Sequence, residues 1–212
     1  MSTDLIDRLA AGLRPAPRLA VVRRLAFGIG AGAALSAVLT AAILGLRPDM
    51  ARAAAGAMFW VKLAYTVALA GLALWVCERL ARPAGEARRR LPWVFVPILA
   101  LAGLAAWQLA WTPEPMRMPM LMGHSARVCP WLILAFSLPP LAGLVWALRG
   151  LAPTRLRITG AVIGLAAGGA GASAYALHCD ESTAPFLVVW YTLGIAAACG
   201  IGWLAGPRIL RW

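Results

Sequence analysis

Acidic residues are scarce in this chain of 212 residues, which has 8 Asp and Glu against 20 Lys and Arg. Its long apolar runs contain no Asp or Glu, whereas ion-coupled transporters usually carry ionisable groups inside the membrane. Four cysteines without a C-x-x-C pair are too few for a disulfide-built scaffold. The phosphate-binding loop, the zinc motif H-E-x-x-H and the nucleophile motif G-x-S-x-G are also missing. We therefore expect neither an enzyme nor a bound cofactor.

Apolar residues dominate the chain, since 62% of it is hydrophobic and its mean hydropathy is +0.77. A soluble protein has about 45–50% apolar residues, and a membrane-spanning helix needs about 20 in succession. The sequence therefore predicts an all-α integral membrane protein with six transmembrane helices. We place them at 25–46, 57–76, 91–111, 128–148, 158–177 and 185–206. Residues 1–24 then form an N-terminal segment, and residues 25–212 form the helix bundle.

Most arginines fall on one side of the six predicted spans: in the N-terminal segment, the loops 77–90 and 149–157, and the C-terminal tail. Loops rich in Lys and Arg stay on the cytoplasmic side of a membrane, so we expect both termini in the cytoplasm. The net charge of +12 follows from these loops, which would contact anionic membrane lipid. We expect no direct binding of nucleic acid.

Lys62 is the only charged residue inside a predicted span. Its side chain can snorkel to the lipid headgroups, which we favour, or be buried in a functional role. Small residues recur every four positions at Gly160, Gly164 and Gly168, and a similar stripe begins at Gly28. Such stripes let two helices approach closely. We favour packing within the bundle over a homodimer.

Two cysteines, Cys129 and Cys179, lie at the outer ends of the fourth and fifth spans. A nine-residue loop joins these spans, so we expect them to be antiparallel neighbours with the two thiols at nearly the same height. A structural disulfide, a pair that responds to oxidant or metal, and two unrelated cysteines are the alternatives. Cys77 and Cys199 are interpreted as small buried apolar residues.

Two histidines lie near these thiols in the sequence, His124 before Cys129 and His178 directly before Cys179. Two thiols and two imidazoles would suit a soft or borderline metal ion. We also expect Arg127 to favour a thiolate at this end of the bundle.

Six stretches of the chain form an ordered set: TDLIDRLA at 3–10, GLRPDM at 45–50, FWVKLAYT at 59–66, LAPTRL at 151–156, YALHC at 175–179 and WYTLGI at 190–195. Together they resemble the NrsF family of anti-sigma factors, six-span proteins of the bacterial inner membrane. The resemblance implies that the chain holds an extracytoplasmic-function sigma factor away from RNA polymerase. It also implies that Cys129 and Cys179, which match the two cysteines of the family, receive an oxidant or heavy-metal signal. A metal ion would then be a transient signal.

The N-terminal segment is the candidate sigma-binding element. Residues 4–13 are expected to form a short amphipathic helix, which is marginal alone in water and gains stability in a groove on a partner or on a lipid surface. The resemblance favours the partner. The candidate sigma-binding residues are Asp4, Leu5, Ile6, Arg8, Leu9 and Leu13.

Joining Cys129 to Cys179 would pull the fourth span against the fifth and release the sigma factor. Two other functions stay open, a membrane thiol oxidoreductase that passes electrons to a quinone and a small metal exporter. The fifty residues between the cysteines argue against the first. The absence of carboxylates from the spans argues against the second.

Overall fold

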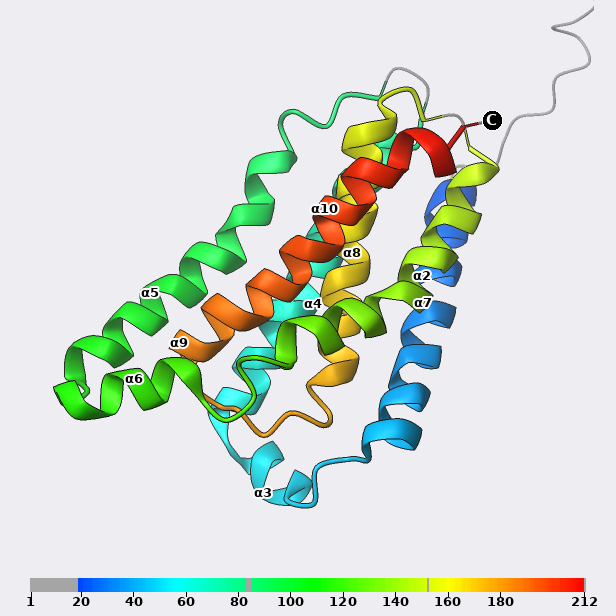
Figure 1. Cartoon of the computed structure of the whole chain (residues 1–212). Helices are drawn as coiled ribbons and strands as arrows, with labels where there is room; N and C mark the ends of the chain where they lie inside the picture. Colours follow the sequence, from blue (N-terminus) through cyan, green and yellow to red (C-terminus); the bar gives the residue numbers. More distant parts are fainter. Residues whose placement is uncertain (1–18, 83–84, 152, 212) are drawn as a thin grey trace, which may run out of the picture.

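A computed structural model describes residues 19–82, 85–151 and 153–211 of the chain. The regular structure of this part is helical throughout, and six helices are long and apolar enough to cross a membrane (Figure 1). These spans are Ala20–Leu44, Ala57–Leu80, Leu91–Trp111, Cys129–Arg149, Leu156–Tyr175 and Ala184–Ile209. The prediction of an all-α fold with six membrane-spanning helices is therefore confirmed.

Three spans are single helices, namely α4 (Ala57–Leu80), α7 (Cys129–Arg149) and α8 (Leu156–Tyr175). The first span is α2 (Ala20–Leu39) with the π-helical turn η1 (Thr40–Leu44), and the third is the 3-10 turn η2 (Leu91–Val94) with α5 (Phe95–Trp111). The last span combines α9 (Ala184–Phe186), the π-helical turn η3 (Leu187–Tyr191) and α10 (Thr192–Ile209). The short helices α3 (Met50–Ala55) and α6 (Glu114–Met122) lie between spans.

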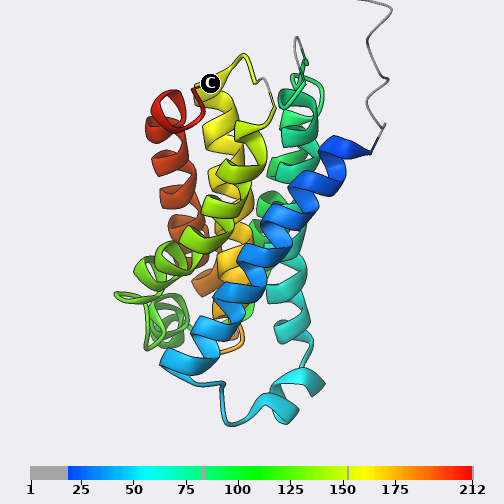
Figure 2. The ribbon, with the colours of Figure 1, turned by 90° about the vertical axis from the view of Figure 1, so that its right-hand side faces the viewer.

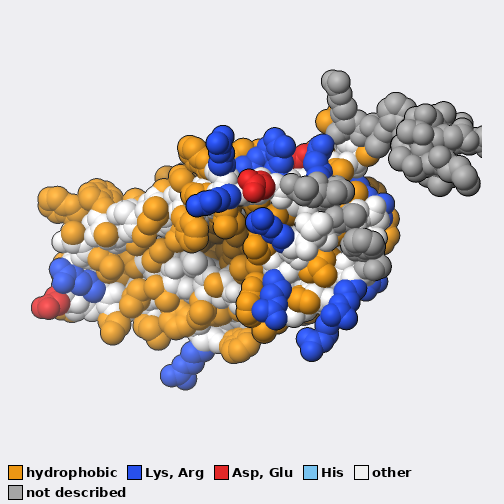
Figure 3. Space-filling model, turned by 90° about the horizontal axis from the view of Figure 1, so that it is seen from above, with side chains coloured by type: hydrophobic (Ala, Val, Ile, Leu, Met, Phe, Trp, Pro, Cys, Tyr) orange, Lys and Arg blue, Asp and Glu red, His pale blue; other side chains and the backbone are white. Residues whose placement is uncertain are grey.

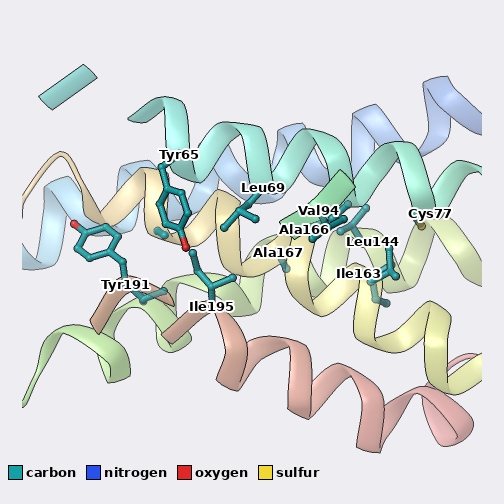
Figure 4. Packing of buried hydrophobic residues seen from close by; sticks show 14 of the residues in the cluster. Tyr65, Leu69, Cys77, Val94, Leu144, Ile163, Ala166, Ala167, Tyr191 and Ile195 are labelled. Carbon is teal, nitrogen blue, oxygen red and sulfur yellow. The ribbon is translucent and has the colours of Figure 1, made fainter. Parts of the chain in front are cut away.

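Helix α8 is the centre of the bundle. Its span is 78% buried, against 17% for the span Leu91–Trp111. Glycine makes this possible, because a Cβ on Gly160 would collide with the backbone of Gly202, and one on Gly164 with that of Ala198. Figure 4 shows the resulting contacts, with Ile163 and Ala167 of α8 among side chains from neighbouring helices. The glycine stripe of α8 is thus used within the bundle, as we expected.

The stripe on α2 is used in the same way. A Cβ on Gly28 would collide with Gly143 of α7, and one on Gly32 would collide with Pro140. The hydroxyl of Ser36 donates a 2.7 Å hydrogen bond to the carbonyl oxygen of Phe136, also on α7. Figure 2 shows α2 crossing the bundle obliquely. Small residues therefore let α2 lie directly on the backbone of α7.

The two ends of the bundle differ in charge. We call the end where α2 begins and α10 ends the arginine-rich end; Figure 3 looks onto it and shows Lys and Arg side chains gathered there. We call the opposite end, where Cys129 and Cys179 lie, the thiol end. The stretches 19–24, 77–90, 149–157 and 207–211, which we predicted to lie on one side, all belong to the arginine-rich end over their described residues.

Five helices extend further toward the arginine-rich end than we predicted, and the extensions of α2 and α4 are the largest. Helix α2 begins at Ala20, and Arg24 in its first turns lies over the ring of Trp146 at 5.1 Å from its centroid. Helix α4 runs to Leu80 and includes Glu78, whose carboxylate accepts hydrogen bonds from Arg82 at 2.6 Å and Arg90 at 3.0 Å. The long helices are therefore not entirely free of carboxylates, but this one is neutralised in the last turn.

Candidate thiol site

Cys129 and Cys179 meet at the thiol end. Cys129 is the first residue of α7, and Cys179 follows α8 in a turn where its N–H binds the carbonyl oxygen of Tyr175 at 3.0 Å. The two thiols lie within hydrogen-bonding reach, with Cys129 donating to Cys179. Both thiols are free. This is the common height that the lengths of the two spans predicted, although fifty residues separate the cysteines.

Both thiols are covered, although the resemblance implies that they receive an oxidant or heavy-metal signal. Cys129 is 0% exposed and Cys179 is 3% exposed. The cover includes the turn 176–183, which is tied to the segment after α6 through Glu181. Its Oε1 accepts hydrogen bonds from the backbone N–H of His124 at 2.5 Å and of Ser125 at 3.2 Å. A reagent therefore reaches the thiols only when this cover opens.

Further bonds fasten the start of the last span to α6 and α5. The indole N–H of Trp190 donates to the carbonyl oxygen of Leu121 at 2.9 Å. The hydroxyl of Thr183 donates to the carbonyl oxygen of Met120 at 2.8 Å. The N–H of Ala184 donates to the side-chain oxygen of Gln108 at 2.9 Å. Helix α6 is thus part of the wall around the site.

Lys62 enters the site from α4. Its side chain is fully buried, and its Nζ donates a 3.0 Å hydrogen bond to the carbonyl oxygen of Cys179. The same ammonium lies 5.4 Å from the ring centroid of Tyr191, within the range of a cation–π contact. The snorkelling that we favoured for Lys62 is therefore wrong, because this side chain turns inward to polar partners.

The surroundings of Cys179 favour its thiolate. The pKa of Cys179 lies below its usual value, first because the thiol of Cys129 donates a hydrogen bond to it. The charge of Lys62 and the N–H of Glu181 act in the same direction, and burial opposes them. Arg127, to which we assigned this role, is exposed on the surface. Cys179 is therefore the better nucleophile of the two, and Cys129 can attack the product.

Arg47 braces the same turn from the loop after α2. Its Nε and Nη2 bind the two carboxylate oxygens of Asp49 at 2.7 and 2.8 Å, and its Nη1 donates to the carbonyl oxygen of Cys179 at 3.4 Å. This pair holds the pKa of the Asp49 carboxyl below its usual range. The N–H of Arg47 also binds the carbonyl oxygen of Leu177 at 3.1 Å. Two cations, Lys62 and Arg47, thus converge on the carbonyl of Cys179.

The two candidate histidines do not join the thiols. The side chain of His124 is 99% exposed, and its Nδ1 lies 3.8 Å from Glu181. The Nδ1 of His178 lies 3.0 Å from the carbonyl oxygen of Gly45. Within the described ranges, no three His, Cys, Asp or Glu residues gather where they could hold a metal ion. A metal ion would therefore meet Cys129 and Cys179 as its two protein ligands here.

Four of the stretches that form the ordered set come together around the thiols. GLRPDM supplies Arg47, FWVKLAYT supplies Lys62, YALHC supplies Tyr175 and Cys179, and WYTLGI supplies Tyr191. Sequence reasoning missed Arg47 and the two tyrosines as neighbours of the thiols, although their place in these stretches was a signal. The candidate sigma-binding residues 4–13 lie outside the described residues.

Comparison with known proteins gives one consistent result. The model of the NrsF family, described as negative regulator of sigma F, matches residues 9–212. The "Anti-sigma-F factor NrsF" of Caulobacter vibrioides (strain NA1000 / CB15N) is 43% identical over 219 residues, which cover 99% of this chain and 98% of that protein. The "Probable anti-sigma-F factor NrsF" of Azospira oryzae (strain ATCC BAA-33 / DSM 13638 / PS) is 38% identical over 210 residues, with the same coverage.

No solved structure matches the chain. The family is one of regulators, which agrees with the expectation that the chain is not an enzyme. The matched residues include the whole helix bundle. The chain belongs to the NrsF family, the negative regulators of sigma F.

Proposed function

We propose that this chain is an anti-sigma factor of the bacterial inner membrane that holds an extracytoplasmic-function sigma factor at its arginine-rich end. Membership of the NrsF family supports the role, and the six apolar helices support the location. The arginines gathered at one end support a cytoplasmic position for that end and for both termini, by the positive-inside rule. The sigma factor binds the N-terminal segment that precedes α2.

The release signal is a reaction of Cys129 with Cys179. The observation that carries this proposal is that the two thiols lie within hydrogen-bonding reach, with Cys179 favoured as thiolate. An azo oxidant such as diamide takes two electrons and two protons from the pair and becomes a hydrazine, while one S–S bond forms. A thiophilic metal ion instead binds both sulfurs and displaces their two protons.

The signal reaches the other end through α7 and α8. Cys129 begins α7, and near the other end of α7 the guanidinium of Arg24 rests on Trp146 and donates to its carbonyl oxygen at 3.4 Å. Arg24 stands in the first turns of α2, directly after the N-terminal segment. Arg149 of α7 also donates to the carbonyl oxygen of Ile209 on α10 at 3.1 Å. A movement of α7 therefore acts on the segment that binds the sigma factor.

The energy of one bridge is sufficient for such a switch. Hundredfold weaker binding of the sigma factor corresponds to about 2.7 kcal/mol of coupling. A disulfide typically contributes about 2–4 kcal/mol, and bridging by a metal is also strong enough. Packing gives no further support to a homodimer, because the glycine stripes of α2 and α8 are both occupied within the chain.

Co-purification tests the proposal. The tagged chain is extracted from its own cells in mild detergent with reductant, and bound proteins are identified by mass spectrometry before and after diamide or a thiophilic metal is added. We expect a sigma factor that leaves the complex on treatment. Cys129→Ser with Cys179→Ser should keep the sigma factor bound under the same treatment, whereas Cys199→Ser should behave as the unchanged chain.

Recovery of the chain without a sigma factor would contradict the anti-sigma role. Release from the Cys129→Ser, Cys179→Ser variant would contradict the thiol switch alone. The closeness of the two thiols also fits a membrane thiol oxidoreductase. Reduction of a quinone by the purified chain, dependent on the same two cysteines, would favour that function instead.

A further inference from the structure

An apolar groove runs between α5 on one side and α8 and α10 on the other. It encloses about 320 Å³. Its walls are almost free of polar atoms, and they include Phe95, Ile98, Leu165, Ile195, Ala196 and Trp203. The lining residues belong to four membrane-spanning segments, since Leu69 of α4 also contributes, so the groove faces the hydrocarbon layer and not water.

Helix α5 stands away from the bundle along this groove. A second apolar groove of about 460 Å³ lies between α5 and α4, so α5 is only loosely packed on two flanks. In Figure 1, α5 runs apart from α4 and α8, and it moves away from them toward the end where it meets α6. Protein interiors leave few voids of this size. A groove that opens into the hydrocarbon layer is filled by the acyl chains of membrane lipids.

The mouth of the groove at the arginine-rich end is basic. Ile158 and Trp203 line the groove and also line a shallow hollow bordered by Arg155 and Arg157. The guanidinium of Arg157 lies 5.1 Å from the ring centroid of Trp203 and is exposed. None of the ion pairs formed among residues 19–82, 85–151 and 153–211 involves Arg157. With no anionic partner among the described residues, its charge can meet an anion at the level of the lipid headgroups.

We propose that this groove is a binding site for one anionic phospholipid. An acyl chain lies between α5 and α10, with Ala196 and Ile195 along its path, and the phosphate of the headgroup binds Arg157. Trp203 lies at the boundary between the acyl chain and the headgroup, where interfacial tryptophans are commonly found. The part of the site that binds the headgroup lies at the end of the bundle opposite the thiols, and lipid binding does not depend on their reaction.

Native mass spectrometry of the full chain in mild detergent tests this site. The chain is titrated with phosphatidylglycerol and, separately, with phosphatidylcholine that has identical acyl chains. One basic side chain near a membrane surface favours an anionic headgroup about fivefold. We expect one copy of phosphatidylglycerol to bind about fivefold more tightly than phosphatidylcholine. Arg157→Gln should remove this preference, and Arg23→Gln should keep it, since Arg23 is exposed at the same end on α2, which does not line the groove.

A variant that fills the groove distinguishes a lipid bound in the groove from lipids that the arginine-rich end attracts by its charge alone. Ala196→Phe places a ring in the groove from an exposed position of α10, so it should abolish binding of the single copy of either lipid while the helix content is unchanged. Equal affinity for the two lipids would overturn the proposal. It would also be overturned if Arg157→Gln and Arg23→Gln behaved alike, if Ala196→Phe still bound one lipid, or if a second copy of the chain occupied the groove.

Discussion

The ammonium of Lys62 donates a 3.0 Å hydrogen bond to the carbonyl oxygen of Cys179, a residue 117 positions away in the chain. Lys62 stands on α4, within a span, and is fully buried. A positive charge in such a place needs polar or anionic partners, because the membrane offers none. The turn that carries Cys179 provides them, and the ammonium in return favours the thiolate of Cys179.

Replacing Lys62 with Met should slow the alkylation of Cys179. Lys62 lowers the pKa of this thiol, so its removal raises that pKa and reduces the thiolate fraction at neutral pH. The rate should fall several-fold at pH 7, and the profile of rate against pH should shift to higher pH. The measurement follows the peptide of Cys179 by mass spectrometry after treatment with a small membrane-permeant maleimide.

Arg127→Gln is the matched control for this change, because Arg127 is an exposed cation at the same end of the bundle. Its pH profile should equal that of the unchanged chain, and Lys62→Arg should restore most of the rate. A Lys62→Met profile that coincides with the unchanged one would show that Lys62 has no influence on the thiol.

Replacing Glu181 with Ala should open the cover over the thiols. The change leaves the backbone N–H groups of His124 and Ser125 without their acceptor, which costs about 1–3 kcal/mol. We expect faster alkylation of Cys129 and Cys179 and a lower midpoint of thermal unfolding in detergent. Glu114→Ala removes an exposed carboxylate from α6 and should change neither quantity.

Gly123→Ala should be destabilising, since Gly123 has a φ of +53° and a Cβ there would collide with the carboxylate of Glu181. The backbone strain alone costs about 1–3 kcal/mol. Gly71→Ala is the control, because nothing lies within 4 Å of its Cβ position and alanine is the better helix former. Thermal unfolding should give a lower midpoint for Gly123→Ala and an equal or higher one for Gly71→Ala. The opposite order would contradict this account of the turn.

Gly160→Ala should loosen the contact between α8 and α10. The added methyl group collides with the backbone of Gly202, and overpacking of this kind costs about 1–3 kcal/mol. Gly103→Ala on α5 adds the same group where nothing lies within 4 Å. We expect a lower unfolding midpoint for the first variant only. Equal midpoints would mean that α8 and α10 can move apart without loss of stability.

The six spans could be predicted because length and hydropathy alone decide them. Helix α6 was missed, since Pro115 and Pro119 in the stretch EPMRMPMLM read as a loop. Pro115 stands in the first turn, where its missing N–H is no loss, and Pro119 is accommodated inside the helix. Local sequence therefore gave the wrong indication where long-range bonds to Thr183 and Trp190 hold the helix in place.

The common height of Cys129 and Cys179 could also be predicted, because it follows from the lengths of two neighbouring spans. Their burial could not, since it depends on Glu181 reaching the backbone of His124. The inward turn of Lys62 was missed for the same reason, as its partner lies 117 residues away. The periodicity of apolar residues indicates which face of a helix is apolar. It carries no information on contacts between residues that lie far apart in the sequence.

The cover over the thiols has a consequence for timing. A buried pair reacts in two stages, first an opening of the turn that Glu181 fastens and then the encounter with the reagent. When the reagent is abundant, the opening rate becomes the limit, and more reagent brings no faster response. A brief pulse that ends before the turn opens leaves the pair unchanged. In the proposed role as a sensor, the site therefore acts as a low-pass filter, which registers the duration of a stress more faithfully than its peak.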